Sequence, residues 1–281
     1  MRGEYLYLVF VIVLCGMWNT LFAQGEEQKE PEFGWKKKVV GNLNMTQNQF
    51  DNWTTGGEDS WSWQLEMLAD FSQDQEKYNW ANSGKLSYGR TKLGNQEARK
   101  AADEIKLESV FSYKLNELLN PYASVTALTQ FTSGYDYGVE PNIKTSKFLD
   151  PGYFTQGLGV LYKASEEFKT RLGASIKETV TDKYADLYAL GDKFRVEVGA
   201  ESVTDLSVQM SELILFTSKL QLFSTLKRFD EIDTDWDNLF SAKISDYITV
   251  SLNIRIFYDK DITPKRQLKQ TLAVGLSYSF I

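Results

Sequence analysis

The sequence predicts an all-β protein, a transmembrane antiparallel up-and-down β-barrel of about twelve strands. The first observation is the stretch 265–281, in which every second residue from Leu272 to Phe280 is apolar and the residues between are small or polar. Such alternation gives a strand one apolar and one polar face. The stretch exceeds the roughly 5–6 residues usual for soluble strands and suffices for the about 9–11 that cross a bilayer at a tilt.

The second observation is that the same pattern recurs along the chain at regular intervals. In order, 39–46 alternates apolar and asparagine residues, 61–71 alternates tryptophan and leucine with polar residues, and 79–92 keeps aromatic residues in phase. The segment 105–114 places lysine and glutamate opposite leucine and phenylalanine, and 121–135 is rich in threonine and alanine, with faces that stay open. Each segment therefore predicts a strand with unlike faces.

The carboxyl-terminal half continues this pattern. Segments 153–164, 168–177 and 194–201 alternate cleanly, with valine, leucine or isoleucine opposite charged residues. The segment 213–223 is the most apolar and its facing stays ambiguous, whereas 236–244 begins at a tryptophan. A further clean strand at 248–258 precedes the closing strand, which brings the count to about twelve, an even number as such barrels require.

The third observation is that connections sort by length. Connections after even-numbered strands, beginning at Ser72, Asn116, Ser165, Thr204 and Ser245, are mostly short. Connections after odd-numbered strands are mostly longer, and they include 47–60, 93–102, 136–152, 181–193 and an acidic loop at 224–235. A helical turn over 96–103 is the alternative to the loop 93–102, and 204–211 is expected as a connection. Short periplasmic turns and long external loops produce this parity in barrels, so we expect 136–152 and 224–235 at the cell surface.

The amino terminus has the features of a secretory signal peptide. Arg2 supplies a short basic start, an apolar run follows, and Ala23 ends the segment before polar residues begin. The run is shorter than the roughly 20 apolar residues of a membrane-spanning helix. We expect a signal peptide at 1–23, a short flexible periplasmic leader at 24–34 and a barrel over 35–281.

The composition argues against several functional classes. The chain has no histidine, and its single cysteine, Cys15, lies in the expected signal peptide. Histidine-dependent hydrolysis, thiol catalysis and the usual zinc sites therefore lack their residues. Carboxylate chemistry stays open, but no pair of acidic residues stands out. A net charge of −7 makes nucleic acid a poor ligand. We expect no enzyme activity and no cofactor.

A motif near the amino terminus carries a family resemblance. Residues 42–47 read Asn-Leu-Asn-Met-Thr-Gln, and 52–58 read Asn-Trp-Thr-Thr-Gly-Gly-Glu. Together with Tyr88 and Gly89, they resemble the family with the domain of unknown function 3078, found in Bacteroidetes-type bacteria. The resemblance implies an outer-membrane barrel from Trp35 onward and no established activity.

The characteristic residues of that motif are Asn52, Trp53, Gly56, Gly57 and Glu58. Two interpretations are open for them. They form either a loop that folds inward or binds a ligand, or a turn at the barrel rim with a tryptophan at the membrane interface.

The acidic stretch 230–237 is a candidate for a hard cation such as calcium, because its aspartates alternate. A calcium-binding EF-hand loop beginning at Asp233 would place glycine and glutamate where this chain has Asn238 and Ile244. The departure favours a solvated loop, so we expect no metal site.

The interior of the predicted barrel is the main candidate site. If apolar faces meet lipid, basic residues outnumber acidic ones inside. The basic set is Lys85, Lys106, Lys114, Lys169, Arg171, Lys177, Arg195, Lys219, Lys243, Arg255 and Lys269, and the acidic set is Glu66, Asp70, Glu108, Glu197 and Glu201. A basic lumen favours anions. A salt-bridged plug that fills the interior is the alternative, because a barrel near twelve strands lies between filled and open ones.

These observations lead us to expect an outer-membrane barrel that passes or binds small polar or anionic solutes. The leading alternative is a structural barrel whose external loops bind a partner, and a soluble periplasmic β protein comes third. The closing strand resembles that of outer-membrane barrels, with Phe280 one residue before Ile281. We therefore expect contacts with outer-membrane lipid and, through this strand, with the barrel-assembly machinery.

Overall fold

The computed structural model describes residues 33–51, 54, 57–184, 193–228, 231–260 and 265–280. Every described residue belongs to one compact unit, which begins at Phe33. The expected signal peptide and residues 24–32 of the expected leader therefore lie outside the described residues. The described part of the chain contains no helix that is long and apolar enough to cross a membrane.

The described residues form strands connected by turns and loops. The strands are β1 (Gly34–Asn48), β2 (Ser60–Asp74), β3 (Tyr78–Leu93), β4 (Arg99–Tyr113), β5 (Leu119–Thr129), β6 (Gly134–Asp136), β7 (Ile143–Ser146), β8 (Gly152–Lys163), β9 (Phe168–Val180), β10 (Phe194–Gln209), β11 (Ile214–Thr225), β12 (Ile232–Lys243), β13 (Ile248–Tyr258) and β14 (Gln267–Ser279).

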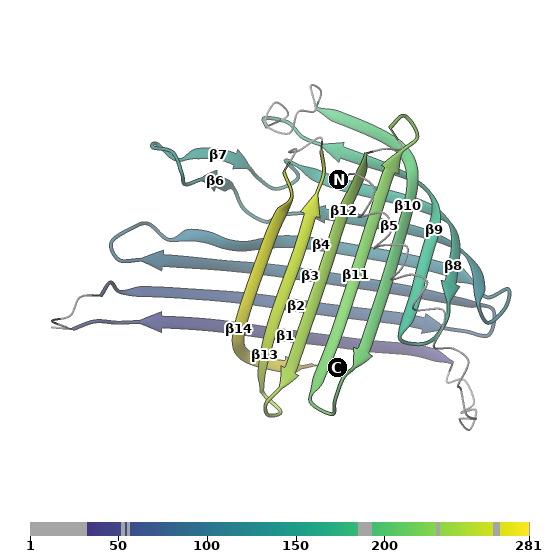
Figure 1. The fold of residues 1–281 in the computed structure, drawn as a ribbon, viewed down its shortest axis with the longest axis horizontal. Helices are drawn as coiled ribbons and strands as arrows, with labels where there is room; N and C mark the ends of the chain where they lie inside the picture. Colours follow the sequence, from purple (N-terminus) through teal and green to yellow (C-terminus); the bar gives the residue numbers. More distant parts are fainter. Residues whose placement is uncertain are drawn as a thin grey trace, which may run out of the picture. The chain divides into compact units, whose positions relative to one another are not determined.

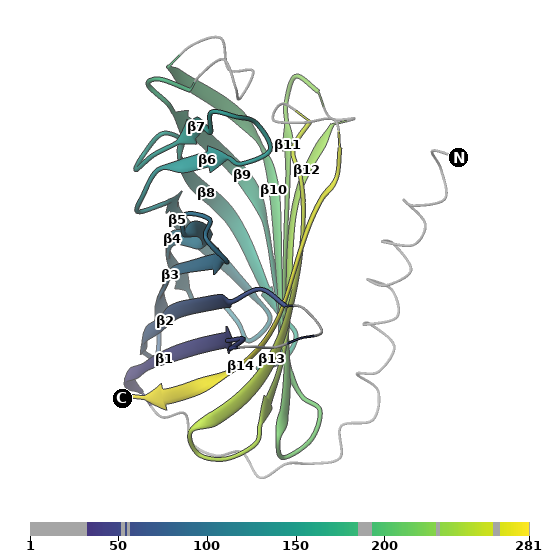
Figure 2. The same cartoon turned by 90° about the vertical axis from the view of Figure 1, so that its left-hand side faces the viewer.

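Twelve of these strands close into an antiparallel up-and-down barrel, which confirms the predicted fold class. Each strand pairs with its neighbours in sequence, except that β5 pairs with β8 and the β6–β7 hairpin stands outside the barrel. The closing strand β14 pairs with β1, from Val40 opposite Ser279 to Asn44 opposite Gly275. Figure 2 shows β14 beside β1, and Figure 1 shows the two inclined walls of the barrel.

The strands extend beyond several of the predicted boundaries. The segment 204–211 is not a connection, because β10 continues to Gln209 with alternating faces. Likewise, β4 begins at Arg99 within the predicted loop 93–102, and no helical turn forms there. The loop predicted at 224–235 is wrong at its end, since β12 begins at Ile232. In each case polar inward residues made strand ends resemble loops.

The connections alternate between short turns and longer loops, as predicted. Short turns join strands at 75–77, 114–118, 164–167, 210–213 and 244–247, and longer loops lie at 49–59, 130–151, 181–193, 226–231 and 259–266. The connection 94–98 is an exception, because it is as short as the turns. We call the two ends of the barrel the turn end and the loop end.

The barrel has a polar interior and an apolar exterior. Among the described residues only Ala102, Tyr122 and Val203 are buried hydrophobic residues, whereas fifteen buried residues are polar or charged. Large apolar side chains are exposed on the outer faces instead, such as Leu158 at 67% and Leu272 at 70%. This inversion of the usual pattern suits a surface that faces hydrocarbon.

Aromatic side chains gather near both ends of the barrel. At the turn end Trp35 lies 6.2 Å from Trp80 between ring centroids, and at the loop end Trp63 meets Tyr88 at 5.7 Å. Amphipathic rings at two levels are the girdles that such barrels place at the membrane interfaces.

The outer face carries two copies of one polar arrangement. On β3 and β4, the Trp80 indole nitrogen donates to the Ser109 hydroxyl at 2.9 Å, and this hydroxyl donates to the Asn82 carbonyl oxygen at 2.8 Å. On β12 and β11, Trp236 donates to Ser218 at 2.9 Å, and Ser218 to Asn238 at 2.9 Å. In both copies the asparagine also donates to a backbone oxygen on the next strand, so its polar groups are satisfied on an apolar face.

Replacing Ser109 with alanine should lower the free energy of unfolding in lipid vesicles by about 1–3 kcal/mol, because an indole donor and an amide acceptor lose their partner. Ser218→Ala should behave alike. The matched control is Ser277→Ala, because the Ser277 side chain faces the interior and has no hydrogen bond to another described side chain. Equal urea midpoints for Ser109→Ala and Ser277→Ala would refute the proposed stabilising role.

Candidate functional site

The site is organised by β4, whose alternation sends every second side chain into the barrel. Glu104, Lys106 and Glu108 point inward, and Ile105 and Leu107 lie between them on the outer face. Apart from Lys85 on the neighbouring β3, the charged partners of the three inward residues lie on β9, β11, β12 and β13. In the barrel order β11, β12 and β13 are five or six strands away from β4. These ion pairs therefore cross the interior from wall to wall.

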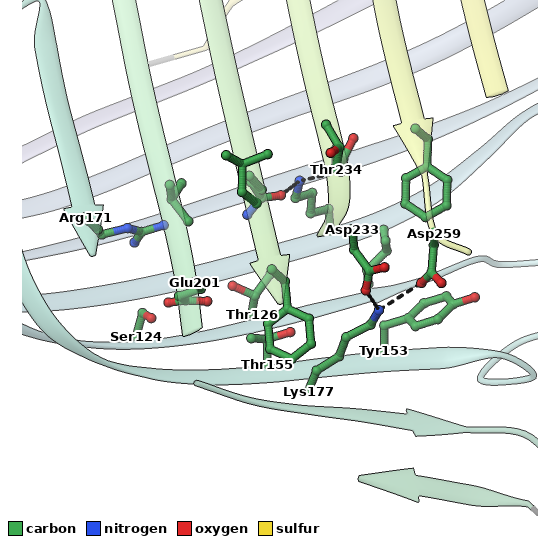
Figure 3. A pocket seen from close by; sticks show the side chains of 18 residues that line it. Ser124, Thr126, Tyr153, Thr155, Arg171, Lys177, Glu201, Asp233, Thr234 and Asp259 are labelled. Carbon is green, nitrogen blue, oxygen red and sulfur yellow. Dashed lines mark hydrogen bonds and ion pairs between the residues drawn. The ribbon is translucent and has the colours of Figure 1, made fainter. Parts of the chain in front are cut away.

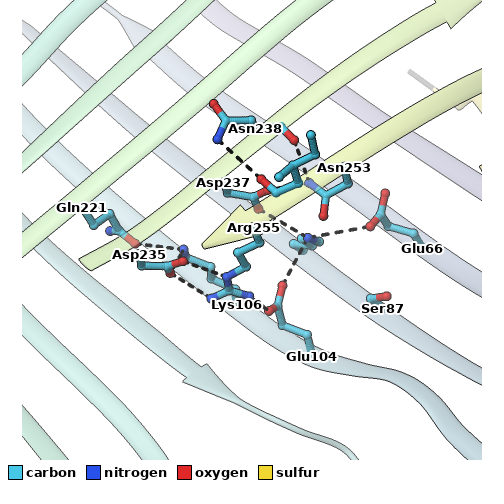
Figure 4. A network of polar contacts seen from close by, with 12 residues as sticks. Glu66, Ser87, Glu104, Lys106, Gln221, Asp235, Asp237, Asn238, Asn253 and Arg255 are labelled. Atoms are coloured by element: carbon cyan, nitrogen blue, oxygen red, sulfur yellow. Dashed lines mark hydrogen bonds and ion pairs between the residues drawn. The ribbon is translucent and has the colours of Figure 1, made fainter. Parts of the chain in front are cut away.

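The first group of these pairs centres on Arg255 of β13 (Figure 4). Its guanidinium donates to Glu104 at 2.5 Å and binds both oxygens of Asp235 at 2.7 and 2.8 Å. Lys85 approaches Glu104 to 3.3 Å. The fork of Arg255 thus binds one carboxylate bidentately and a second from the opposite wall, which is the strong geometry for such pairs.

Lys106 lies between this group and the next. Its ammonium donates to the Gln221 side-chain oxygen at 3.0 Å and lies 3.8 Å from Asp235 (Figure 4). Asp235 keeps its two bonds to Arg255, so Lys106 is held by weaker contacts than its neighbours.

The second group centres on Glu108. Its carboxylate forms ion pairs with Arg171 of β9 and Lys219 of β11, and the Glu108 and Arg171 side chains are 8% and 6% exposed. Lys219 also lies 3.6 Å from Asp205. We call Lys85, Glu104, Lys106, Glu108, Arg171, Lys219, Asp235 and Arg255 the charge layer. Each basic member has a carboxylate within 4.0 Å.

A tyrosine side chain lies next to the charge layer inside the barrel. The Tyr122 hydroxyl donates to Glu201 at 3.1 Å, and Arg171 lies 5.6 Å from the centroid of the Tyr122 ring. Inward glycines make room for these groups, because a Cβ on Gly173 would come within 2.8 Å of the Tyr122 hydroxyl and one on Gly157 would collide with Glu201.

Two cavities meet at the charge layer. The loop-side cavity contains about 900 Å³ of empty space and is lined near the strand ends by Tyr153, Lys177 and Asp259 (Figure 3). The turn-side cavity contains about 1800 Å³ and reaches Glu166 in a short turn. Both volumes include space open to solvent. Lys106, Gln221 and Asp235 line both cavities, so these three residues form the boundary between them.

The loop-side cavity contains a third charged group. Lys177 of β9 donates to Asp233 of β12 and to Asp259 beyond β13, both at 2.8 Å (Figure 3). Asp233 belongs to the acidic stretch considered as a cation site, so its carboxylate serves an ion pair inside the barrel instead of a solvated loop. Among the described residues no group of three or more potential ligands could hold a metal ion.

The remaining predicted interior residues occupy the two ends of the barrel. Lys169 and Lys269 line the turn-side cavity, and Lys114 pairs with Asp74 at 2.7 Å near a turn. Arg195 pairs with its near neighbour Glu197 at 2.7 Å on β10. By contrast, Lys243 pairs with Asp246 at 2.8 Å at the turn end, where its side chain is 57% exposed.

Of the family-like motif, the structure describes Gly57 and Glu58, while Asn52, Trp53 and Gly56 lie outside the described residues. Gly57 has a φ of +153°, and a Cβ there would clash with the ring of Phe50. Both residues belong to the connection between β1 and β2 at the loop end.

The basic excess expected from the sequence is smaller in the structure. Asp205, Asp233 and Asp235, which we placed in connections, lie on strands and pair with interior basic residues at 3.6, 2.8 and 2.7 Å. Glu104, at the edge of a predicted strand, also faces inward. The interior is therefore close to balanced in charge and gives no reason to expect a strong preference for anions.

The family model "Protein of unknown function (DUF3078)" matches residues 45–135, which confirms the resemblance over that part of the chain. No curated protein matches the sequence.

Solved structures with a similar fold include membrane barrels of several kinds. The translocator domain of the autotransporter NalP from Neisseria meningitidis has a TM-score of 0.37 at 10% identity, with 96% of this chain and 94% of that chain covered. The NanC porin has a TM-score of 0.40 at 7% identity, with 85% of this chain and 97% of that chain covered. The Pseudomonas putida toluene transporter TodX has a TM-score of 0.37 at 12% identity, with 89% of this chain and 90% of that chain covered. At these values the fold assignment depends on this chain's own strand pairing.

The closed barrel, the apolar exterior and the charged interior together define the class of transmembrane β-barrels of the outer-membrane type. Within that class, residues 45–135 carry the DUF3078 family match.

Proposed function

We propose that this protein resides in the outer membrane and lets small polar solutes pass by diffusion through the barrel. The observation that supports this proposal is the pair of cavities that meet at Lys106, Gln221 and Asp235. A solute that enters from either end reaches the charge layer. Lys106 is the member of this layer whose side chain is held by the weakest contacts. Lysine side chains are flexible and make single-point contacts, so movement of Lys106 would join the cavities.

The charge layer would act as the selective step of this passage. Each of its five basic groups lies near a carboxylate of the layer, and Glu66 and Asp205 beside the layer are further acidic partners of Lys85 and Lys219, so an ion gains little there while it loses hydration. Small neutral solutes with hydrogen-bonding groups have no ionic hydration to lose and need no charged partner. The barrel should therefore be narrow and weakly ion-selective, unlike a wide water-filled porin.

Delivery to the membrane is part of the proposal. The signal peptide expected at 1–23 would export the chain, and the closing strand β14 would be recognised by the barrel-assembly machinery. The apolar outer face, exemplified by Leu272 and Leu158, would then contact lipid.

Liposome swelling tests the proposed passage. Vesicles containing the purified barrel should swell in isotonic solutions of small neutral solutes such as glycerol, at rates that fall steeply as solute size increases. Empty vesicles and vesicles with a barrel of known pore size serve as controls. No swelling with glycerol, in vesicles where the barrel is shown to be folded, would contradict the proposal.

The orientation of the barrel gives a further prediction. Asn142 is exposed in the connection between β5 and β8 at the loop end. A cysteine at position 142 should react with a membrane-impermeant maleimide on whole cells, and the expected mature chain offers no competing thiol. A cysteine at Glu117, exposed in a turn, is the matched control and should react only in broken cells. The opposite pattern would invert the orientation.

A second candidate function has an observation of its own. The β6–β7 hairpin stands outside the barrel wall at the loop end, and its surroundings expose large apolar side chains, including Ile143 at 55% and Phe148 at 54%. Exposed apolar groups on such a loop suit contact with a partner. Deletion of residues 135–145 would abolish this role and leave liposome swelling intact.

A further inference from the structure

We propose that the loop-side cavity binds a small neutral molecule with several hydroxyl groups and an apolar face, of which a pyranose ring is the simplest example. This inference rests on the proposed passage and names the class of solute that would use it. Four features of the cavity carry it: compensated charges, free hydroxyl groups, apolar walls and an unfilled space beside one strand.

The charges in this cavity already have partners. Lys177 is held by Asp233 and Asp259, each at 2.8 Å. At the floor of the cavity Lys106 donates to Gln221, and Glu201 accepts from Tyr122 at 3.1 Å. A charged ligand would have to break one of these contacts and leave a buried group without its partner, which is costly. A neutral ligand is therefore favoured.

Hydroxyl groups, by contrast, are available on one wall. Ser124 and Thr126 of β5 and Thr155 of β8 point into the cavity, and Thr126 lies directly opposite Thr155 in the strand register. Figure 3 shows Thr126 and Thr155 between Glu201 and Lys177, and Ser124 next to Glu201. Within the described ranges, no side chain or backbone group is hydrogen-bonded to these three hydroxyls. Each hydroxyl can donate and accept, which matches the same group on a ligand.

The other walls are apolar. Leu128, Tyr153, Val203, Phe223 and Phe257 line the cavity from five different strands. The Phe223 ring lies 5.5 Å from the Lys177 ammonium, which fixes the ring near the charged group. Aromatic and aliphatic walls with a few convergent polar groups are typical of small-molecule sites. A ring with an apolar face could pack on these walls while its hydroxyls reach Thr126 and Thr155.

The cavity has room at the hydroxyl wall because Gly157 lies opposite Ser124 in the register. A Cβ at this glycine would come within 2.8 Å of the Ser124 hydroxyl oxygen and would collide with the Glu201 carboxylate. The absence of a side chain at Gly157 thus keeps the hydroxyls accessible and lets Glu201 keep its hydrogen bond to Tyr122.

Saturation-transfer NMR with the folded barrel in detergent micelles tests this inference with a named probe, methyl α-D-glucopyranoside. Wild-type protein should give a saturable signal, and sodium glucuronate and glucosamine hydrochloride should bind more weakly. The variant Thr126→Val with Thr155→Val keeps the shape of both side chains and removes their hydroxyls. Its dissociation constant should rise by about tenfold, the loss expected for two neutral hydrogen bonds.

The control variant is Thr217→Val, which removes an equivalent hydroxyl from the turn-side cavity and should leave the dissociation constant unchanged. Circular dichroism and heat-dependent gel mobility show whether each variant is folded, and Thr155→Val alone, with a smaller expected loss, replaces the double variant if that one is not. No saturable binding by wild type, unchanged binding by the folded double or single variant, or tighter binding of either charged sugar would overturn the inference.

Liposome swelling separates this inference from the proposed function. Swelling with glycerol but no saturable glucoside signal would refute the ligand class and leave passage intact. A saturable signal lost in the double variant, without any swelling, would support the ligand site and refute passage.

Discussion

Replacing Glu108 with glutamine is expected to destabilise the barrel by about 3–5 kcal/mol, the range for removing one partner of a buried ion pair. The substitution keeps the shape of the side chain and removes only its charge. Arg171, 6% exposed, then loses its carboxylate, and Lys219 retains only Asp205 at 3.6 Å. Two basic groups would be left close together inside the barrel.

The measurement is urea unfolding in lipid vesicles, followed by tryptophan fluorescence. Glu166→Gln is the matched control, because Glu166 lies in a turn, its side chain is 89% exposed and it pairs with Lys163 at the surface. Exposed pairs contribute little, so this variant should unfold like wild type. If Glu108→Gln shows the same unfolding midpoint as Glu166→Gln, the pairs across the interior do not stabilise the barrel.

The second large effect is expected in the closing strand. Val274 is 60% exposed on the outer face, and its neighbour Ala273 lines the turn-side cavity. An arginine at Val274 would face lipid and cost about 2–4 kcal/mol near the bilayer midplane. An arginine at Ala273 would reach water and the carboxylates of the interior, and should cost less.

This comparison uses adjacent positions on one strand, so differences in strand propensity and assembly largely cancel. Folding yield and urea midpoint in vesicles report the difference. Greater damage from Ala273→Arg than from Val274→Arg would mean that the faces of β14 are reversed or that the apolar side does not meet lipid.

Alternation in the sequence was enough to predict most of the barrel. The residues from Leu272 to Phe280 alternate throughout, and the segments that became β2 and β13 alternate over most of their length, because one face meets lipid and the other water. The prediction failed at the ends of several strands: the starts of β4 and β12 at the loop end, and the end of β10 at the turn end. Asp233 and Asp235 face inward and alternate with Thr234 and Trp236, so the start of β12 looked like an acidic loop.

The charge layer was partly accessible from the sequence. The alternation of inward and outward residues along each strand identified Lys106, Glu108, Arg171 and Arg255 as inward residues. It could not show which of these side chains form ion pairs with one another. Glu104 and Arg255 are separated by 151 positions and are joined only when the barrel closes. Pairing across the interior depends on strand order and register, which local patterns do not encode.

The account depends most on the claim that Lys106 separates two connected cavities. Single-channel conductance in planar bilayers tests it directly by comparing wild type with Lys106→Ala. This variant shortens one of the three side chains that line both cavities, while Asp235 keeps its bidentate bond to Arg255, so little charge is left unpaired. Lys169→Ala shortens an equivalent side chain in the turn-side cavity and serves as the control.

Wild type should form small channels with weak ion selectivity, because the charge layer is compensated and leaves a narrow passage. Lys106→Ala should raise the conductance severalfold, and Lys169→Ala should leave it near the wild-type value. If neither wild type nor Lys106→Ala forms channels although both are folded and inserted, the interior is a permanent plug and the proposed passage is wrong.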